Sequence, residues 1–283
     1  MALRDGRRIA IAEFGTAAGT PVFYFHGFPA SRLEGRLVHR AAVRQRVRLV
    51  ALDRPGFGYS DFRPRTLADW PGDVAEVADA LGLQRFAILG LSGGAPFALA
   101  CAASLVARVS ATAIVSGLGM TSVGEDFARL EVFARMSFRL ARSAPALSRT
   151  VNRALAAVLR RRPELLDKLL AADTSAPDRV VLADPEVVAM LAASLREALR
   201  AGSNGASHEL RLLARPWNFD VSAVRVPCHI WHGEQDSTVP IEMARRLAGL
   251  IPGCRAKYFA DEGHFSLPLR HADTVLKMLL QHA

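Results

Sequence analysis

The chain has 283 residues, of which 51% are hydrophobic and 22% charged, a composition that allows one globular unit with a large core and excludes a disordered or fibrous protein. The formal net charge is +9, but the basic excess is spread over residues 1–65 and 120–215 with acidic residues among it, so we expect no nucleic-acid partner. No apolar run approaches the roughly 20 residues that span a bilayer, and the first residues do not resemble a secretory signal, which predicts a cytoplasmic protein without a membrane partner.

The first part of the chain alternates between two kinds of segment. Up to residue 119, short apolar runs rich in strand-forming residues alternate with segments of helical periodicity, which is typical of a parallel sheet covered by helices. The predicted strands are 8–14, 22–25, 47–52, 86–91 and 109–115, and the predicted helices are 33–46, 69–81 and 93–103. This pattern predicts an α/β fold with a mostly parallel central sheet.

The alternation stops at residue 120. Residues 120–215 are rich in Arg, Leu and Ala, show helical periodicity and contain no convincing strand. Prolines divide this stretch into about four predicted helices, and they are Pro145, Pro163, Pro177 and Pro185. The segment 201–206, AGSNGA, is predicted to be a loop.

The strand–helix rhythm returns in the last part of the chain. The predicted elements there are strands 226–231 and 256–260 and helices 240–250 and 267–281. A helical block that interrupts a parallel sheet is most simply a cap over the carboxyl ends of the strands, where open α/β sheets bind ligands. We therefore expect an α/β core of residues 1–119 and 216–283 with an inserted helical cap of residues 120–215.

A serine lies on the predicted turn between strand 86–91 and the following helix, in the sequence Gly90-Leu91-Ser92-Gly93-Gly94. Such a strand-to-helix turn is too tight for a side chain two residues before or after the serine, and Gly90 and Gly94 meet that requirement. The turn would expose the Ser92 hydroxyl above the sheet and aim the first helix amides at it. Ser92 is therefore the candidate nucleophile.

A serine hydroxyl needs a base, and His264 follows predicted strand 256–260 in a loop. Asp236 follows the preceding strand, where its carboxylate would fix the tautomer of the imidazole and stabilise its protonated form. The acid could instead be the neighbouring Glu234 or follow the strand that precedes the cap. The competing acids are Glu234, Glu125 and Asp126.

The sequence His26-Gly27-Phe28-Pro29 follows predicted strand 22–25. An oxyanion hole needs two backbone N–H groups that point at one spot, and we expect these to be the amides of Phe28 and Gly93, since Pro29 has none. His26 could be mistaken for a general base, but beside Gly27 it is expected to brace the loop.

No cofactor or metal is expected. The three cysteines form no CxxC pair and are expected in the core, and they are Cys101, Cys228 and Cys254. His229 and His232 fall on opposite faces of a predicted strand, which argues against a shared metal. The glycine patterns of nucleotide-binding loops do not occur.

Taken in order, these motifs resemble the α/β-hydrolase superfamily over nearly the whole chain. The shared features are HGFP (26–29), DRPGFGYS (53–60), GLSGG (90–94), HGEQD (232–236) and EGH (262–264). The resemblance implies a catalytic triad of Ser92, Asp236 and His264 with Phe28 and Gly93 as oxyanion donors. Haloalkane dehalogenases and epoxide hydrolases of this fold carry Asp where this chain has Ser92, and the HGGG motif of lipases is absent, so an esterase is the better match.

The expected reaction is hydrolysis of an ester, thioester or lactone through an acyl-enzyme on Ser92, with a small, hydrophobic acyl substrate and a monomeric or homodimeric protein. Two alternatives remain. Cofactor-free haloperoxidases or perhydrolases of the superfamily use a similar triad, and some members of the fold are small-molecule receptors with vestigial turnover.

Substrate preference is expected from the cap. Its apolar residues either contact a hydrophobic substrate or form the cap's own core, and they are Phe127, Phe133, Met136, Phe138, Leu140, Met190 and Leu191.

Overall fold

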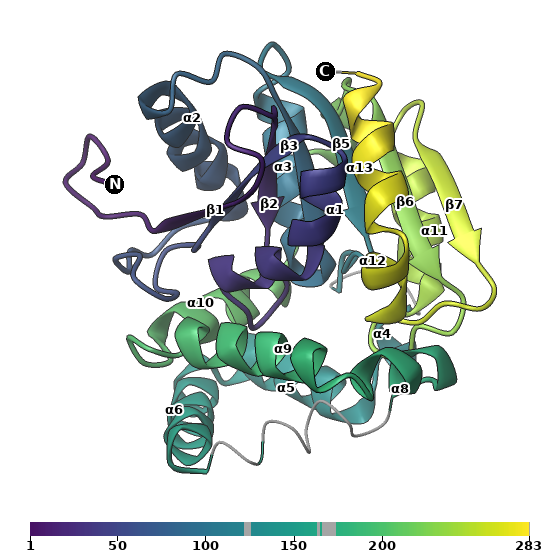
Figure 1. Cartoon of the computed structure of the whole chain (residues 1–283). Coiled ribbons are helices and arrows are strands. Elements are labelled where there is room, and N and C mark those ends of the chain that lie inside the picture. Colours follow the sequence, from purple (N-terminus) through teal and green to yellow (C-terminus); the bar gives the residue numbers. More distant parts are fainter. Residues whose placement is uncertain (122–125, 163–164, 166–173, 283) are drawn as a thin grey trace.

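A computed structural model describes residues 1–282 except 122–125, 163–164 and 166–173 (Figure 1). Its strands form one sheet in the order β1-β3-β2-β4-β5-β6-β7. The strands are β1 (Ile11–Gly15), β2 (Thr20–Phe25), β3 (Val47–Leu52), β4 (Phe86–Leu91), β5 (Val109–Val115), β6 (Cys228–Gly233) and β7 (Arg255–Phe259). Only the pairing of β1 with β3 is antiparallel within the described sheet. The predicted α/β fold with a mostly parallel sheet is confirmed.

The middle strands are buried on both faces. Every residue of β4 and of β5 is buried, and both are continuous apolar runs apart from Ser110 and Thr112 of β5. Such runs are what a parallel sheet covered on both sides requires. The prediction of 86–91 and 109–115 as strands is confirmed to the residue, whereas predicted strand 8–14 begins only at Ile11.

Two layers of helix cover the sheet (Figure 1). On one face lie α1 (His39–Arg44) and α13 (Ala272–Leu280), whose apolar residues pack with Tyr24, Leu89 and Ala113 of the strands. The other face is covered by α2 (Trp70–Ala80), α3 (Ala95–Ser104) and α11 (Ile241–Leu250). In α2 the predicted apolar stripe faces the core, since Val74, Val77 and Ala78 are fully buried.

Two predicted helices are each divided in the structure. Predicted helix 33–46 is a 3₁₀ helix η1 (Arg32–Val38) followed by α1. Predicted helix 267–281 is α12 (Ser266–Arg270) and α13, separated at His271. His271 leaves the helical conformation because its ring packs on Phe259 and its Nε2 lies 3.0 Å from Glu262 Oε1. These contacts outweigh the continuous helical pattern.

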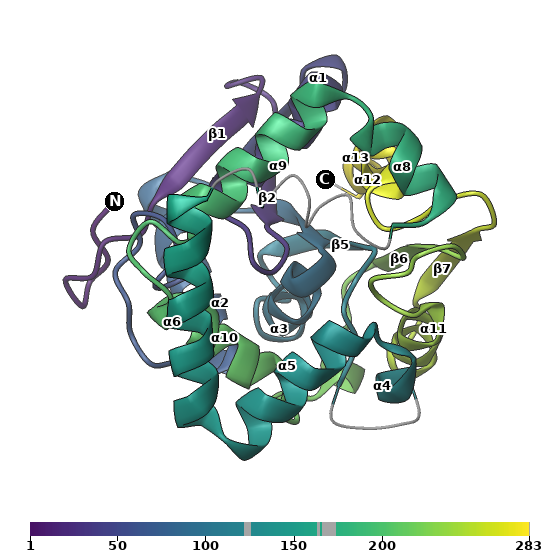
Figure 2. The same ribbon diagram turned by 90° about the horizontal axis from the view of Figure 1, so that it is seen from below.

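The described part of residues 120–215 is helical and lies across the carboxyl edge of the sheet, at the bottom of Figure 1. We call it the helical layer. It consists of α4 (Asp126–Arg129), α5 (Val132–Ser143), α6 (Pro145–Arg161), α8 (Ala176–Leu182), α9 (Pro185–Ala198) and α10 (Asn204–Leu213). Seen from below, α5, α6 and α9 are arranged around the position of α3 (Figure 2).

The prediction of about four helices in this stretch is wrong, because six lie within its described residues. Pro145, Pro177 and Pro185 do begin helices, but other boundaries carry no proline. The carboxylate of Glu131 caps α5 by accepting from two backbone amides, and the loop 201–206 is shorter than predicted because α10 begins at Asn204. Pro163 lies outside the described residues.

No helix in the described ranges is both long and apolar enough to cross a membrane. Of the cysteines expected in the core, Cys101 and Cys228 are buried and Cys254 is half-buried.

Candidate active site

Ser92 lies on the sharp turn between β4 and α3. Its backbone φ is +49°, in the left-handed region that a non-glycine residue rarely adopts. A Cβ at Gly90 would lie 2.7 Å from the Cβ of Ala98, and one at Gly94 would lie 2.2 Å from the carbonyl oxygen of Phe25. Neither position therefore has room for a side chain, because Gly90 packs against Ala98 and Gly94 against the backbone of Phe25.

Asp236 and His264 meet beyond the ends of β6 and β7. Oδ2 of Asp236 lies 2.8 Å from Nδ1 of His264, and both residues are buried. The other carboxylate oxygen of Asp236 accepts from the amides of Thr238 (2.9 Å) and Val239 (2.8 Å). The carboxylate is thus held by its own loop and is aimed at one ring nitrogen of His264, which leaves Nε2 available to the other side.

The two groups shift each other's pKa toward the charged forms. Burial raises the pKa of Asp236, but the charge and hydrogen bond of His264 outweigh it and lower that pKa below its ordinary value. Burial lowers the pKa of His264, but the charge and hydrogen bond of Asp236 raise it above its ordinary value of 6.5. The pair therefore stabilises an imidazolium that forms when His264 takes up a proton.

A second histidine, His232, touches the same carboxylate. Its Nε2 lies 2.8 Å from the carbonyl oxygen of Val239 and 3.4 Å from Oδ2 of Asp236. Burial lowers the pKa of His232, so the ring is neutral and its N–H donates to Val239. It supports the loop that holds Asp236 without competing for the proton of His264.

Ser92 and His264 line one cavity of about 180 Å³ between the sheet edge and the helical layer. Among the contacts of the described residues, no hydrogen bond joins the Ser92 hydroxyl to the His264 ring. In proteins without bound substrate such bonds are often long and shorten only when the substrate binds. The walls of the cavity are mostly apolar and include Leu191 and Leu195 of α9.

The Phe28 and Gly93 backbones lie side by side next to Ser92. A Cβ at Gly93 would lie 3.1 Å from the amide nitrogen of Phe28, and one at Gly27 would lie 3.5 Å from the Cβ of Ser92. The absence of a side chain at both glycines lets the loop after β2 approach the turn after β4. Both backbone N–H groups predicted to form the oxyanion hole are therefore next to the candidate nucleophile.

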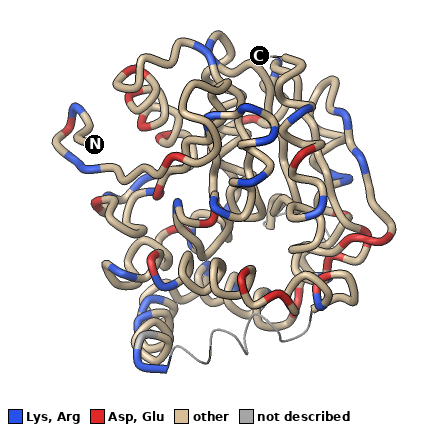
Figure 3. Tube along the Cα trace, viewed as in Figure 1, with Lys and Arg blue, Asp and Glu red and all other residues tan. Residues whose placement is uncertain are grey.

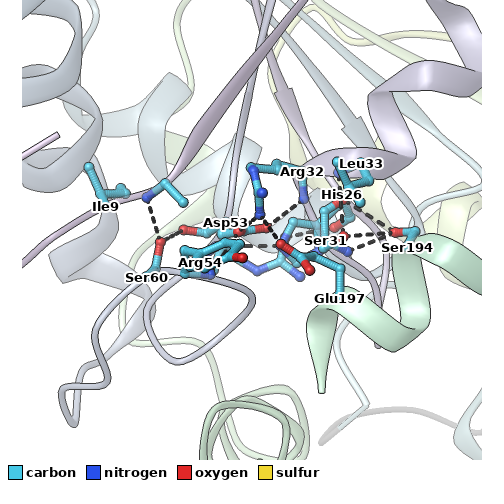
Figure 4. Close-up of polar contacts among 12 residues, drawn as sticks. Ile9, His26, Ser31, Arg32, Leu33, Asp53, Arg54, Ser60, Ser194 and Glu197 are labelled. Atoms are coloured by element: carbon cyan, nitrogen blue, oxygen red, sulfur yellow. Dashed lines mark hydrogen bonds and ion pairs between the residues drawn. The ribbon is translucent and has the colours of Figure 1, made fainter. Parts of the chain in front are cut away.

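The loop after β2 is braced by buried polar groups, some of which are drawn in Figure 4. Nδ1 of His26 lies 2.8 Å from the carbonyl oxygen of Gly27. The guanidinium of Arg54 donates to the carbonyl oxygens of His26 (2.6 Å) and Gly27 (3.0 Å) and also to Oε1 of Glu209 (2.6 Å). Burial, together with the charge of Arg54, lowers the pKa of His26 and keeps its ring neutral. His26 thus lies in the position expected of a brace.

Glu209 belongs to α10, so the helical layer supplies part of this bracing. Its other oxygen accepts from Arg65 at 2.8 Å, and the side chains of Arg54 and Glu209 are fully buried. Arg32 makes a similar link, because it pairs with Asp53 of the core and with Glu197 of α9 (2.8 Å) (Figure 4).

Asp178 of α8 makes a third link, to the loop that carries His264. Its Oδ2 accepts from the amide of His264, and its Oδ1 accepts from the amides of Phe265 and Ser266, all at 2.8 Å. These amides begin α12, so a buried carboxylate from another helix caps it. The charge of Asp178 also favours protonated His264.

Several residues considered from the sequence lie away from the cavity. Of the seven apolar residues expected in the cap, only Leu191 lines it, whereas Phe133 and Met136 are exposed and Phe138 is buried in the core. Glu234 is exposed. Glu125 and the side chain of Asp126 lie outside the described residues.

Sequence reasoning missed three carboxyl groups, Glu34, Asp178 and Glu209, that are buried at or near the cavity. A signal existed for Asp178, since Ser-Ala-Pro-Asp is typical of a helix start, but it indicated a cap of its own helix. Among the described residues, no group of three or more His, Cys, Asp and Glu side chains has the arrangement of a metal site.

Comparison with known proteins matches a family model described as the alpha/beta hydrolase fold to residues 20–270. The chain is 29% identical, over 93% of its length, to the dihydrolipoyllysine-residue acetyltransferase component of the acetoin cleaving system of Cupriavidus necator, of whose length it spans 63%. It is 26% identical to 2-hydroxymuconate semialdehyde hydrolase of Pseudomonas putida, over 97% of this chain and 92% of that protein. Esterase RhEst1 of Rhodococcus sp. ECU1013 has a similar structure, with a TM-score of 0.69 and 23% identity over 100% of this chain and 98% of the esterase.

Proposed function

The chain belongs to the α/β-hydrolase fold family, and on this premise we propose that it hydrolyses carboxylic esters through an acyl-enzyme formed on Ser92. The observation that carries the proposal is the placement of Ser92. Its backbone φ lies in the left-handed region, and it begins the turn into α3. It also shares a cavity with His264, whose Nδ1 lies 2.8 Å from the buried carboxylate of Asp236.

The first half of the reaction transfers the acyl group to the enzyme. Nε2 of His264 accepts the hydroxyl proton while Oγ of Ser92 bonds to the ester carbonyl carbon, and the carbonyl electron pair moves onto oxygen. The amides of Phe28 and Gly93 donate to that oxyanion. When the tetrahedral intermediate collapses, the bond to the alcohol breaks and the imidazolium returns the proton to the leaving oxygen.

The second half releases the acid. His264 takes a proton from water, the resulting hydroxide attacks the acyl carbon, and the returning proton regenerates the Ser92 hydroxyl. Asp236 accepts from Nδ1–H of His264 throughout, which fixes the tautomer with Nε2 toward the cavity. The small apolar cavity suits a hydrophobic acyl group, and we assign to the helical layer the role of a cap that forms its wall.

The proposal is tested with nitrophenyl esters, acyl thioesters and lactones of graded chain length, using the wild type and Ser92→Ala. We expect turnover of at least one ester series by the wild type and a loss on the order of 10⁶ in kcat for the variant, with unchanged circular dichroism. Bromination dependent on acetate and peroxide that exceeds ester hydrolysis would indicate a perhydrolase instead. Tight ligand binding without repeated turnover would indicate a receptor.

A further inference from the structure

The cavity that contains Ser92 and His264 also contains a carboxyl group that has no part in the acyl transfer. Glu34 of η1 lines this cavity although only 6% of the residue is exposed. Among the described residues that line the cavity, it is the only Asp or Glu. A carboxyl group in such apolar surroundings is costly to bury unless its oxygens have hydrogen-bond partners.

One oxygen of Glu34 has these partners. Oε2 accepts from the amide of Gly27 at 2.7 Å and from the hydroxyl of Tyr24 at 3.0 Å. Tyr24 is buried in β2, and Gly27 follows the same strand, so both donors come from the rigid part of the fold. They fix the plane and position of the carboxyl group.

The other oxygen lies on the side of Gly27 that faces Ser92. A Cβ on Gly27 would lie 3.2 Å from Oε1 of Glu34 and 3.5 Å from the Cβ of Ser92, so Oε1 and Ser92 flank the same side of Gly27. No donor to Oε1 occurs among the described residues. The fold thus holds, at the edge of the cavity that Ser92 also lines, an acceptor without a partner among the described residues.

We propose that Oε1 of Glu34 accepts a hydrogen bond from a hydroxyl group of the substrate, and that the enzyme therefore prefers hydroxylated esters. This inference rests on the proposed ester hydrolysis and names its substrate class. A hydroxyl fits better than an ammonium group, which has three donors to satisfy. Apart from Ser92 and His264, the other polar side chains among the described lining residues are those of Ser194 and Thr238, and the Ser194 hydroxyl already accepts from the amide of Ser31 at 2.9 Å.

The test compares three matched p-nitrophenyl esters: 3-hydroxybutyrate, 3-methoxybutyrate and butyrate. A methoxy group can accept but not donate, so it separates hydrogen bonding to Oε1 from polarity alone. A second series with the hydroxyl in the alcohol part, 2-hydroxyethyl butyrate against propyl butyrate, covers the other side of the scissile bond. In at least one series we expect kcat/KM of the wild type to favour the hydroxylated ester about tenfold over the unsubstituted one.

The variant Glu34→Gln tests the inference by replacing the acceptor that faces the cavity with a donor. Its amide oxygen takes the place of Oε2 because both donors point there, which turns an N–H₂ group toward the cavity. The hydroxyl preference should fall severalfold while the methoxy ester gains relative to butyrate. Tyr24→Phe is the matched control, because it removes a donor to Oε2 without changing Oε1, and its substrate ratios should equal those of the wild type. Ratios within one variant cancel any general loss of turnover.

Equal kcat/KM values for hydroxylated and unsubstituted esters in both series, or a wild-type preference for the methoxy ester, would overturn the inference while leaving ester hydrolysis intact. Failure to hydrolyse any ester would instead overturn the proposed function. An altered ratio in Tyr24→Phe equal to that in Glu34→Gln would also count against the role of Oε1.

Discussion

The helical layer consists of two unlike halves. The helices α8, α9 and α10 each place a carboxylate against the core: Asp178 on the amides of the His264 loop, Glu197 on Arg32, and Glu209 on Arg54 and Arg65. The helices α5 and α6 have no such link. They carry exposed apolar side chains such as Phe133 and Leu147, and residues 132–162 contain no Asp or Glu. Figure 3 shows Lys and Arg positions following α6 at the lower left.

The contrast teaches which half of the layer belongs to the site. A buried charge is tolerated only with a partner, so each buried ion pair fixes the relative position of the two segments that it joins. The link of α8 ends on the His264 loop after β7, that of α9 on Arg32 at the start of η1, and that of α10 on Arg54, which follows β3 and braces the loop after β2. We therefore expect the site to be sensitive to changes in α8 to α10 and tolerant of changes on the exposed faces of α5 and α6.

Among the links between the helical layer and the core, the largest effect on stability is expected at Glu209. The change Glu209→Ala leaves Arg54 and Arg65 buried without their shared carboxylate, which should cost about 3–5 kcal/mol in the free energy of unfolding. The midpoint of urea unfolding measures the loss. The control is Glu186→Ala in α9, whose pair with Arg40 is exposed and should contribute less than about 1 kcal/mol. Similar losses in both variants would show that burial of the pair is unimportant.

A smaller effect, specific to activity, is expected at Asp178. In Asp178→Asn the amides of the His264 loop lose an ionised acceptor, and misplacement of the ring should lower kcat/KM about ten- to a hundredfold. The pH profile gives a second measurement. His264 acts as a base only when unprotonated, so activity rises with pH through its pKa, which Asp236 and, less strongly, Asp178 raise.

In the wild type, the apparent pKa of the acid limb of the kcat/KM profile should therefore lie above the pKa of an ordinary imidazole. In Asp178→Asn this apparent pKa should be lower than in the wild type. A variant that loses activity without any movement of the acid limb would mean that Asp178 has only a structural role.

The smallest effect is expected on the exposed side of α5. Phe133 is 66% exposed, so Phe133→Ala should change the free energy of unfolding by no more than about 0.5 kcal/mol and leave ester turnover unchanged. Phe138 of the same helix is 7% exposed, and Phe138→Ala should cost about 3–5 kcal/mol. Thermal unfolding of the two variants compares the faces directly, and equal losses would refute the assignment of one exposed and one buried face to α5.

Features that local interactions determine could be predicted from the sequence, whereas features that depend on contacts between distant residues could not. Strand 109–115 and the Ser92 turn are determined by local patterns, namely a buried apolar run and glycines in a tight turn, and both were predicted correctly. Asp178 could not be assigned, because its three partner amides lie 86 to 88 residues away. The amphipathic pattern of α5 likewise indicates that one face is apolar without indicating what that face contacts, so the exposure of Phe133 could not be foreseen.

The measurement that most directly tests the central proposal is labelling with a fluorophosphonate probe followed by peptide mass spectrometry. The probe forms a stable bond only with an activated serine. We predict stoichiometric labelling at Ser92 in the wild type, no labelling in Ser92→Ala, and labelling slowed by orders of magnitude in His264→Ala. A folded wild-type protein that hydrolyses esters without labelling at Ser92, or that is labelled at another serine, would contradict the acyl-enzyme proposed for Ser92.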